Sequence, residues 1–221
     1  MCGIGLVNKD DEHAPQIIKA ANCELYTYSE ESKEADFVAS DIRYVSQPDF
    51  VGTEFHISGK YDMEVRLGIP GLFNVVNALA AVSVCSFLGL DQARIRHALE
   101  NIRVNGRMEI VYTSERCTVL VDYAHNAVSM ESLLSTLRDY KPKRLVCVFG
   151  CGGNRSKDRR YSMGEIGGKM ADLSIITADN SRYEKVEDII ADIRGSIEKT
   201  GGKFIEIPDR REAIRYSILH A

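Results

Sequence analysis

The spacing of apolar residues divides the chain into two parts with different patterns. The first part shows short apolar runs or partial alternation, which is typical of strands in a half-exposed sheet. These predicted strands cover residues 4–7, 23–28, 36–45 and 53–67. Apolar residues then recur at helical spacing, which predicts a helix over residues 73–88 closed by Gly89. Asp91 is predicted to cap a second helix that ends before Gly106.

In the second part, predicted strands and helices alternate regularly. The predicted strands cover residues 118–121, 144–149, 173–177 and 203–207, and the predicted helices cover 128–137, 163–170, 186–197 and a last segment capped by Asp209. Such alternation with buried apolar strands predicts a parallel sheet covered on both faces. The fold class is therefore α/β, and a candidate boundary between residues 107 and 114 separates domains 1–110 and 111–221.

Composition narrows the class of protein. The chain has 221 residues, of which 44% are hydrophobic and 27% charged, as in ordinary globular proteins. The net charge of −4 argues against a broadly basic nucleic-acid binder. No apolar run approaches the roughly 20 residues needed to span a bilayer, and the N-terminus lacks the pattern of a targeting peptide. We therefore expect a cytoplasmic, monomeric protein with no nucleic-acid or membrane partner.

The six cysteines indicate neither a metal site nor a disulfide framework. They are Cys2, Cys23, Cys85, Cys117, Cys147 and Cys151. No two of them form a C-x-x-C pair, so free thiols in a reducing cytosol are expected.

The two ends of the sequence differ from those of most domains. The chain opens directly on the apolar stretch 3–7 and stops inside a helical pattern at 211–220, with no Gly or Asn cap after it. Because whole domains usually begin and end in polar residues, we expect this chain to be a fragment.

Candidate binding residues follow three of the predicted parallel strands, and ligands bind at the carboxyl ends of such strands. The loop 150–160 holds three glycines and then four cations within six residues, followed by a helix. Glycines let backbone N–H groups approach a ligand, and a helix N-terminus favours negative charge, so this loop suits a phosphate or a carboxylate. The alternative is a glycine turn followed by a solvated charge run. No Walker A sequence is present in the chain.

The other two loops carry weaker signals. Asp179, Asn180 and Arg182 can accept and donate hydrogen bonds, and a guanidinium binds a carboxylate in a bidentate fork, which suits a zwitterionic ligand. Helix capping with a solvated Arg182 is the alternative. Asp122 and His125 follow the strand 118–121. His125 could act as a general base, a metal ligand or a hydrogen-bond donor. The case for a metal ligand is weak because no Cys or second His is nearby in the sequence, and a lone histidine at a strand end is more often structural.

Three candidates lie in the first part of the chain. Asn74 and Asn77 share one helix face and could bracket a flat base such as adenine; the alternative is helix capping, which explains Asn74 better. Arg107 follows a turn at the domain joint, where a cation could reach phosphate; the alternative is a solvated arginine paired with Glu109. No residue is assigned a catalytic or metal-binding role.

Five segments together resemble a known family. In order, they read Gly71-x-Phe73-Asn74-x-x-Asn77, Gly106-Arg107-Met108-Glu109, Asp122-Tyr123-Ala124-His125-Asn126, Gly150-Cys151-Gly152-Gly153-Asn154-Arg155 and Asp179-Asn180-Ser181-Arg182. The ordered set resembles the Mur ligases of bacterial cell-wall synthesis over nearly the whole chain. The resemblance implies that domain 1–110 is the tail of the central ATP-binding domain. It also implies that 111–221 is most of a Rossmann-like, parallel-sheet C-terminal domain that binds the amino acid.

The resemblance further implies an ATP-dependent ligase that forms an amide. The side-chain carboxylate of D-glutamate in UDP-MurNAc-L-Ala-D-Glu would become an acyl phosphate, which the amino group of a diamino acid attacks. ATP and Mg²⁺ would be the cofactors, with the metal ligands outside this chain. By the same resemblance, Asn74 and Asn77 would meet the adenine, Arg107 the phosphates and Asp122 the ribose.

The incoming amino acid would be held by Arg155, Asn180 and Arg182, with Asp179 and His125 beside them, as the resemblance implies. The arginine of the Asp-Asn-x-Arg tetrad points to meso-diaminopimelate, because lysine's second ammonium would be repelled by it. Two departures from the family pattern are present: Ser181 stands in place of the usual proline, and residues 158–161 read Asp-Arg-Arg-Tyr in place of Gly-Lys-Arg-Pro.

Several family parts have no counterpart in the sequence: the UDP-sugar domain, the phosphate-binding loop, the metal ligands and the last part of the C-terminal domain. We therefore expect the chain to be inactive alone. Alternatives are a lysine-adding Mur ligase, a folylpolyglutamate or cyanophycin synthetase, and a non-catalytic nucleotide- or anion-binding module. A dehydrogenase is disfavoured because no G-x-G-x-x-G follows a strand.

Overall fold

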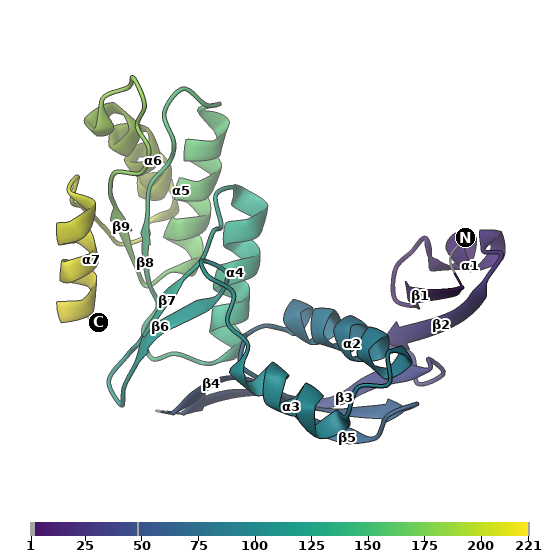
Figure 1. The fold of residues 1–221 in the computed structure, drawn as a ribbon. Helices are drawn as coiled ribbons and strands as arrows, with labels where there is room; N and C mark the ends of the chain where they lie inside the picture. The colour runs from purple at the N-terminus through teal and green to yellow at the C-terminus, as the bar shows by residue number, and fades with distance from the viewer. Residues whose placement is uncertain (1–2, 48, 221) are drawn as a thin grey trace. The chain divides into compact units, whose positions relative to one another are not determined.

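The computed structural model describes residues 3–47 and 49–220 (Figure 1). The chain divides into two compact units, Met1–Glu109 and Ile110–Ala221, and each unit has a hydrophobic core of its own. The predicted α/β class is confirmed, because both units combine helices with sheets that contain parallel strand pairs.

The first unit is built on a five-stranded sheet in the order β1-β2-β3-β4-β5. Its strands are β1 (Ile4–Asn8), β2 (Glu24–Ser29), β3 (Phe37–Gln47), β4 (Phe50–Gly59) and β5 (Met63–Leu67). The pairs β1·β2 and β2·β3 are parallel, whereas β3·β4 and β4·β5 are antiparallel. Helix α2 (Leu72–Phe87) packs on this sheet, with Val75 and Leu79 in the same buried cluster as Phe55.

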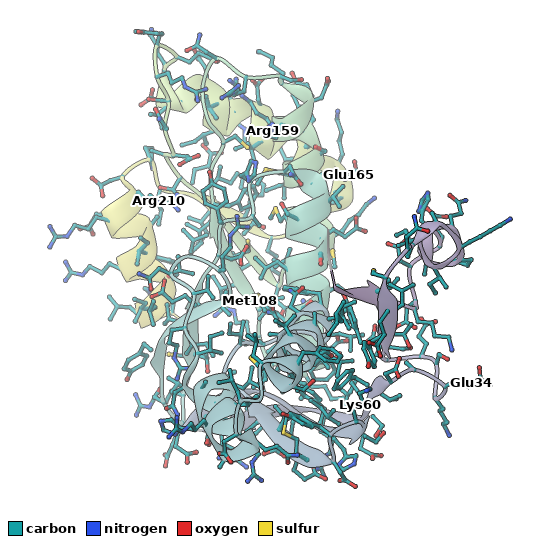
Figure 2. All side chains as sticks on the ribbon, turned by 45° about the vertical axis from the view of Figure 1, so that its right-hand side comes forward. Glu34, Lys60, Met108, Arg159, Glu165 and Arg210 are labelled. Carbon is teal, nitrogen blue, oxygen red and sulfur yellow. The ribbon has the colours of Figure 1, made fainter. Side chains whose placement is uncertain are left out.

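Two features of this unit differ from the sequence-based expectation. Residues 53–67 form parts of two strands, because the chain turns after Gly59, whose φ of +104° favours glycine. Lys60 follows in the turn, and its Nζ lies 3.9 Å from the centroid of the Tyr26 ring (Figure 2). Helix α1 (Ala14–Ala20) has one buried residue, Ala14, so apolar periodicity does not predict it.

Helix α3 (Gln92–Asn101) is the second predicted helix of this unit, and its cap is confirmed. The Oδ1 atom of Asp91 accepts hydrogen bonds from the N–H groups of Ala93 and Arg94, at 3.0 and 3.1 Å. Ile95 and Leu99 bury the inner face of the helix in the same core as α2. The cap and the apolar face therefore agree on where this helix lies.

The second unit contains a parallel sheet in the order β10-β9-β8, formed by β8 (Val146–Phe149), β9 (Leu173–Ile176) and β10 (Phe204–Glu206). Its helices are α4 (Ala127–Asp139), α5 (Asp158–Met170), α6 (Val186–Thr200) and α7 (Arg210–Leu219). Ile176 packs with α4, α5 and α6, whereas Leu173 and Ile175 pack with α7. Figure 1 shows α7, in yellow, on the opposite side of these strands from α4 and α5. The prediction of a parallel sheet covered on both faces is confirmed.

The expected fourth strand of that sheet belongs elsewhere, and this part of the prediction is wrong. β7 (Thr118–Val121) pairs with β6 (Glu109–Thr113) in a separate two-stranded sheet. The two strands are joined by a short turn in which the Ser114 N–H donates to the Cys117 carbonyl at 2.9 Å. Closing so short a loop costs little chain entropy, which favours the pairing of β6 with β7. Val121 is 45% exposed, so this strand is not buried as the expectation required. The Asp122–His125 loop therefore does not follow a strand of the three-stranded sheet.

Close approach between α5 and α6 depends on glycine. A Cβ at Gly164 would lie 2.7 Å from the carbonyl oxygen of Ile193, and one at Gly168 would lie 2.2 Å from the Thr200 hydroxyl. Gly195, inside α6, would meet nothing within 4 Å. The two helices pack as closely as they do because these positions of α5 carry no side chain.

We expect Gly164→Ala and Gly195→Ala to change stability in opposite directions. Overpacking against the Ile193 backbone should outweigh the helix propensity gained at position 164, for a net loss of about 1 kcal/mol in the free energy of unfolding. At position 195 the propensity gain acts alone and should add about 0.5–1 kcal/mol. Urea unfolding of both variants measures this. Equal stabilisation by both would contradict the close packing of α5 on α6.

Among residues 3–47 and 49–220, no helix combines the length and the apolar character that crossing a membrane requires. The same residues contain no group of three or more His, Cys, Asp or Glu side chains placed to hold a metal ion. Cys23, Cys85, Cys117, Cys147 and Cys151 are free thiols, and Cys2 lies outside the described residues.

Candidate functional site

The candidate site of the second unit lies where β8 and β9 end. Phe149 and Ile176 are paired in register, so the chain leaves both strands at the same edge of the sheet. The Thr177 N–H donates to the Phe149 carbonyl at 3.0 Å, and a Cβ at Gly150 would lie 2.2 Å from the Thr177 oxygen. We call the segment 150–157 the glycine loop and the segment 177–185 the tetrad loop. They start side by side, as the parallel-sheet rule predicts.

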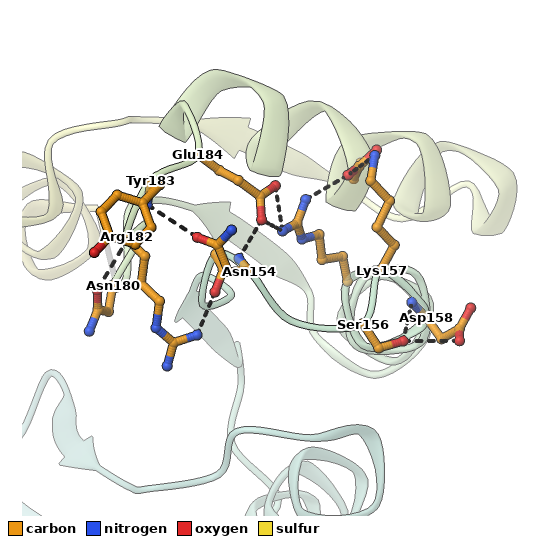
Figure 3. Close-up of polar contacts among 11 residues, drawn as sticks. Asn154, Ser156, Lys157, Asp158, Asn180, Arg182, Tyr183 and Glu184 are labelled. Atoms are coloured by element: carbon orange, nitrogen blue, oxygen red, sulfur yellow. Dashed lines mark hydrogen bonds and ion pairs between the residues drawn. The ribbon is translucent and has the colours of Figure 1, made fainter.

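The two loops remain joined further from the sheet (Figure 3). The Gly153 N–H donates to the carbonyl of Asn180 at 2.8 Å, and the Tyr183 N–H donates to Oδ1 of Asn154 at 3.2 Å. The guanidinium of Arg182 donates to the carbonyl of Gly153. A Cβ at Gly153 would lie 1.9 Å from the Ser181 oxygen, so only glycine permits this approach. The structure thus brings Arg182 and Asn180 against the loop that carries Arg155.

Two residues of these loops have the left-handed backbone conformation. Asn154 has a φ of +52° and Arg182 a φ of +50°. Asparagine tolerates this region, whereas an arginine there is uncommon and is maintained by its surroundings. The Arg182 N–H donates to Oδ1 of Asn180 at 3.3 Å, which helps to hold that conformation. The direction of the Arg182 side chain is therefore set by the backbone of the tetrad loop.

The charge run of the glycine loop is not the open cationic edge that the sequence predicts. Arg160 is 1% exposed; its Nη2 lies 2.7 and 2.8 Å from the two oxygens of Glu184, and its Nη1 lies 2.9 Å from Oδ2 of Asp192. Lys157 Nζ lies 3.1 Å from the same oxygen of Asp192. Two of the four cations are thus paired with carboxylates, Arg160 in the interior and Lys157 at the surface. Arg155 is exposed at the start of the run.

The carboxylates of this network stay ionised at neutral pH. The hydrogen bond from Arg160 lowers the pKa of Glu184, and the N–H of Asn154 lowers it further. Burial raises the pKa of Asp192, but hydrogen bonds from Arg160 and Lys157 outweigh burial, so its pKa is also lowered. Burial raises the pKa of the Cys151 thiol to about 11, which leaves it protonated and unsuited to a nucleophile's role.

Glu184 and Asp192 were not among the residues that sequence patterns single out. They lie 24 and 32 positions after Arg160, and no spacing rule links residues so far apart. One signal does exist in the sequence: acidic residues 184, 187, 188 and 192 follow the basic run 155–160 one strand later. Opposite charges on consecutive strand-helix units can meet where the two helices pack side by side, as α5 and α6 do here.

The Asp122–His125 loop is ordered by its own contacts. Oδ1 of Asp122 accepts from the Ala124 N–H at 2.7 Å, and the His125 Nδ1 lies 3.1 Å from the Tyr123 carbonyl. The Tyr123 and His125 rings lie 5.1 Å apart, centroid to centroid, and both side chains are exposed. Asn126 then caps α4 in a capping box with Ser129. Asp122 and His125 therefore lie in one ordered loop that leads into α4.

The candidates of the first unit lie in α2, which holds Asn74 and Asn77, and in the turn before β6, which holds Arg107. Nδ2 of Asn74 donates to the carbonyl of Pro70 at 2.7 Å, and Asn77, which is exposed, donates to Oδ1 of Asn74 at 3.5 Å. The bond to Pro70 is not the N-terminal cap of the alternative, because a cap accepts from a backbone N–H, and the N-cap position of α2 is Gly71 with no side-chain capping bond. Arg107 is exposed. Oε2 of Glu109 accepts from the Gly106 N–H at 2.7 Å and so holds the turn before Arg107.

Comparison with known proteins covers both units. The family model described as "Mur ligase, glutamate ligase domain" matches residues 106–221, and the "Mur ligase middle domain" matches residues 1–85. The 2,6-diaminopimelate ligase of UDP-N-acetylmuramoyl-L-alanyl-D-glutamate from Caldanaerobacter subterraneus is 37% identical over 98% of this chain and 44% of its own length. A second such ligase, from Clostridium acetobutylicum, is 39% identical over 99% of this chain and 44% of its own length.

Solved structures agree on the architecture. A 2,6-diaminopimelate ligase of the same description superposes with a TM-score of 0.74 at 32% identity, covering 99% of this chain and 45% of that one. Folylpolyglutamate synthase from Thermotoga maritima superposes with a TM-score of 0.75 at 21% identity, covering 95% of this chain and 48% of that one, and this likeness shows the fold alone. The chain spans less than half the length of these relatives.

Proposed function

Since the chain belongs to the Mur ligase family, we propose that it forms part of an ATP-dependent ligase that adds meso-diaminopimelate to UDP-MurNAc-L-Ala-D-Glu in peptidoglycan synthesis. Its second unit would bind the diamino acid, and its first unit would contribute to the ATP site. The relatives at 37–39% identity, all named as 2,6-diaminopimelate ligases, support this substrate. We place the reaction in the cytoplasm, where ATP is available, in a monomer with small molecules as its partners.

One observation carries the proposal: Arg182 and Asn180 lie against the glycine loop, at the edge of the sheet where β8 and β9 end. A guanidinium recognises a carboxylate through two parallel hydrogen bonds. Asn180 and Asp179 are both exposed: the amide N–H of Asn180 can donate to the carboxylate of an amino acid, and the carboxylate of Asp179 can accept from its ammonium. Arg155, exposed on the neighbouring loop, supplies the second guanidinium that a dicarboxylic amino acid requires. His125 is proposed as a further contact to the same ligand.

In the proposed reaction, the γ-phosphoryl group of ATP passes to the D-glutamate side-chain carboxylate, which gives an acyl phosphate and releases ADP. The diamino acid's amino group then attacks the acyl carbon, an amide forms and inorganic phosphate leaves. We assign Asn77 and Asn74 to the adenine, Arg107 to the phosphates and Asp122 to the ribose. Asn77 fits that role better, because it is exposed, whereas Asn74 is bound to the Pro70 carbonyl.

Mg²⁺ would screen the phosphate charge when bound, as in other phosphoryl transfers. The described residues contain no group of three or more candidate ligands, so we assign none of them to the metal.

Titration of the 221-residue chain with meso-diaminopimelate and with L-lysine tests the substrate. We expect diaminopimelate to bind at least tenfold more tightly, because its distal carboxylate can pair with Arg182, whereas the distal ammonium of lysine is repelled. NMR shifts should change at Asn180, Arg182 and Gly153. Tighter binding of lysine would favour a lysine-adding ligase, and no binding of either would contradict the assignment of this site.

A further inference from the structure

One carboxylate links the two loops of the candidate site to the helices behind them. Glu184 lies at the end of the tetrad loop, two residues before α6 begins. Its Oε1 accepts a hydrogen bond from the backbone N–H of Asn154 in the glycine loop, and both of its oxygens accept from Nη2 of Arg160 (Figure 3). Glu184, which follows β9 in the chain, thus contacts a loop and a helix that both follow β8.

The anchor of this arrangement is Arg160. It lies in the first turn of α5, is 1% exposed and also pairs with Asp192 on α6. A guanidinium so fully enclosed, with carboxylates on two of its nitrogens, has little freedom to move. Whatever Glu184 holds is therefore held relative to the rigid α5–α6 pair.

A chain of hydrogen bonds runs from Glu184 to the proposed ligand-binding arginine. Glu184 accepts from the N–H of Asn154, whose φ is +52°. The side chain of Asn154 accepts from the N–H of Tyr183, directly after Arg182, whose φ is +50°. Two left-handed residues thus stabilise each other across the loops. A non-glycine residue in this conformation is strained, and the strain persists only when its surroundings impose it.

We propose that Glu184 is a positioning residue for the diamino acid: held by Arg160, it fixes Asn154 and through it the backbone that aims Arg182. We call Arg160, Glu184 and Asn154 the clamp. The inference rests on the proposed function, because it takes the diamino acid as the ligand of Arg182. It adds a residue that touches no ligand and acts through the geometry of the two loops.

Asp192 provides a matched control. Like Glu184, it is a carboxylate paired with the buried guanidinium of Arg160, and it lies 2.9 Å from it. Its other partner is Lys157, which is exposed, and an exposed ion pair contributes little. Asp192→Asn and Glu184→Gln therefore remove the same kind of partner from the same guanidinium, but only Glu184→Gln also disturbs the bond to the Asn154 N–H.

The experiment compares three variants of the 221-residue chain: Glu184→Gln, Asp192→Asn and Asn154→Ala. The measurements are urea unfolding, NMR amide exchange, and the dissociation constant for meso-diaminopimelate. Glu184→Gln should weaken diaminopimelate binding at least tenfold and accelerate exchange of the Asn154 and Tyr183 amides. Asp192→Asn should lower stability by a similar amount yet change the dissociation constant less than threefold. Asn154→Ala should weaken binding as Glu184→Gln does and lower stability less than Glu184→Gln does, because Asn154 is exposed, although alanine tolerates its left-handed φ less well than asparagine.

The outcomes separate this inference from the proposed function. If Glu184→Gln and Asp192→Asn weaken binding equally, in proportion to lost stability, the clamp is merely structural and the inference is wrong. If Glu184→Gln does not fold, the test rests on Asn154→Ala, and wild-type affinity of that variant for diaminopimelate would overturn the inference. A wild-type chain that binds no diaminopimelate would contradict the proposed function. If the wild-type chain binds diaminopimelate and the variants Glu184→Gln and Asn154→Ala bind it equally tightly, the positioning role is contradicted and the proposed function is not.

Discussion

Replacing Arg182 by alanine is expected to weaken meso-diaminopimelate binding by about 100-fold or more and to leave ATP binding nearly unchanged. Arg182 is exposed in the free chain, but its pair with the ligand carboxylate is expected to be buried in the complex; truncating one partner of such a buried pair typically costs about 2–5 kcal/mol, and each 1.4 kcal/mol is a factor of ten. The variant also loses the hydrogen bond from the guanidinium to the Gly153 carbonyl, which joins the two loops. Titrations of the chain with diaminopimelate and with ATP, done separately, measure both effects.

Lys185→Ala is the matched control for that variant. Lys185 is an exposed cation in the same loop, three residues further along, so its removal changes the local charge equally without removing the guanidinium. We expect it to weaken diaminopimelate binding less than threefold, since exposed charges contribute little. Equal loss of diaminopimelate and ATP binding by Arg182→Ala would count against a specific role in holding the amino acid.

The second large effect is expected from Arg160→Met. Methionine retains much of the apolar stem, so the change mainly leaves Glu184 and Asp192 without their shared partner. Breaking a buried ion pair by removing one side typically destabilises by about 3 kcal/mol or more. We expect about 3 kcal/mol here, measured as the free energy of unfolding in urea.

Two comparisons sharpen this test. Arg159→Met changes the neighbouring, less buried arginine (Figure 2) and should cost less than about 1 kcal/mol. The triple variant R160M/E184Q/D192N should recover part of the loss, because no charge is then left unpaired. A triple variant less stable than R160M would show that the two carboxylates stabilise the fold by contacts other than those with Arg160.

The parts of the fold that sequence predicts well are those whose burial follows a period. Helix α6 is an example: Ile189, Ile193 and Ile197 lie on one face, and all are buried. Helix α5 is an element whose start apolar periodicity does not predict. It begins at Asp158 rather than near Met163, because its first turn is polar, and Arg160 is buried there by ion pairs that apolar periodicity does not detect.

The candidate site divides in the same way. The position of the glycine and tetrad loops follows from the parallel-sheet rule, which needs only the order of strands and helices. The pairing of Arg160 with Glu184 and Asp192 does not follow, because those carboxylates are distant in sequence and nothing local marks them. The sequence alone therefore predicts a run of four exposed cations, whereas the folded chain pairs two of them, Lys157 and Arg160, with carboxylates. The roles of the nine candidate binding residues remain proposals.

The left-handed backbone at Arg182 constrains how this protein could evolve a new preference. Under the proposed function Arg182 selects the amino acid, yet the φ of +50° at this position admits few side chains without penalty. In a library randomised there and selected for another substrate, Asn and Gly should be recovered readily, whereas Val and Ile should be rare even where an apolar contact would help. Evolution toward an aliphatic substrate would then first require a compensating change in the loop.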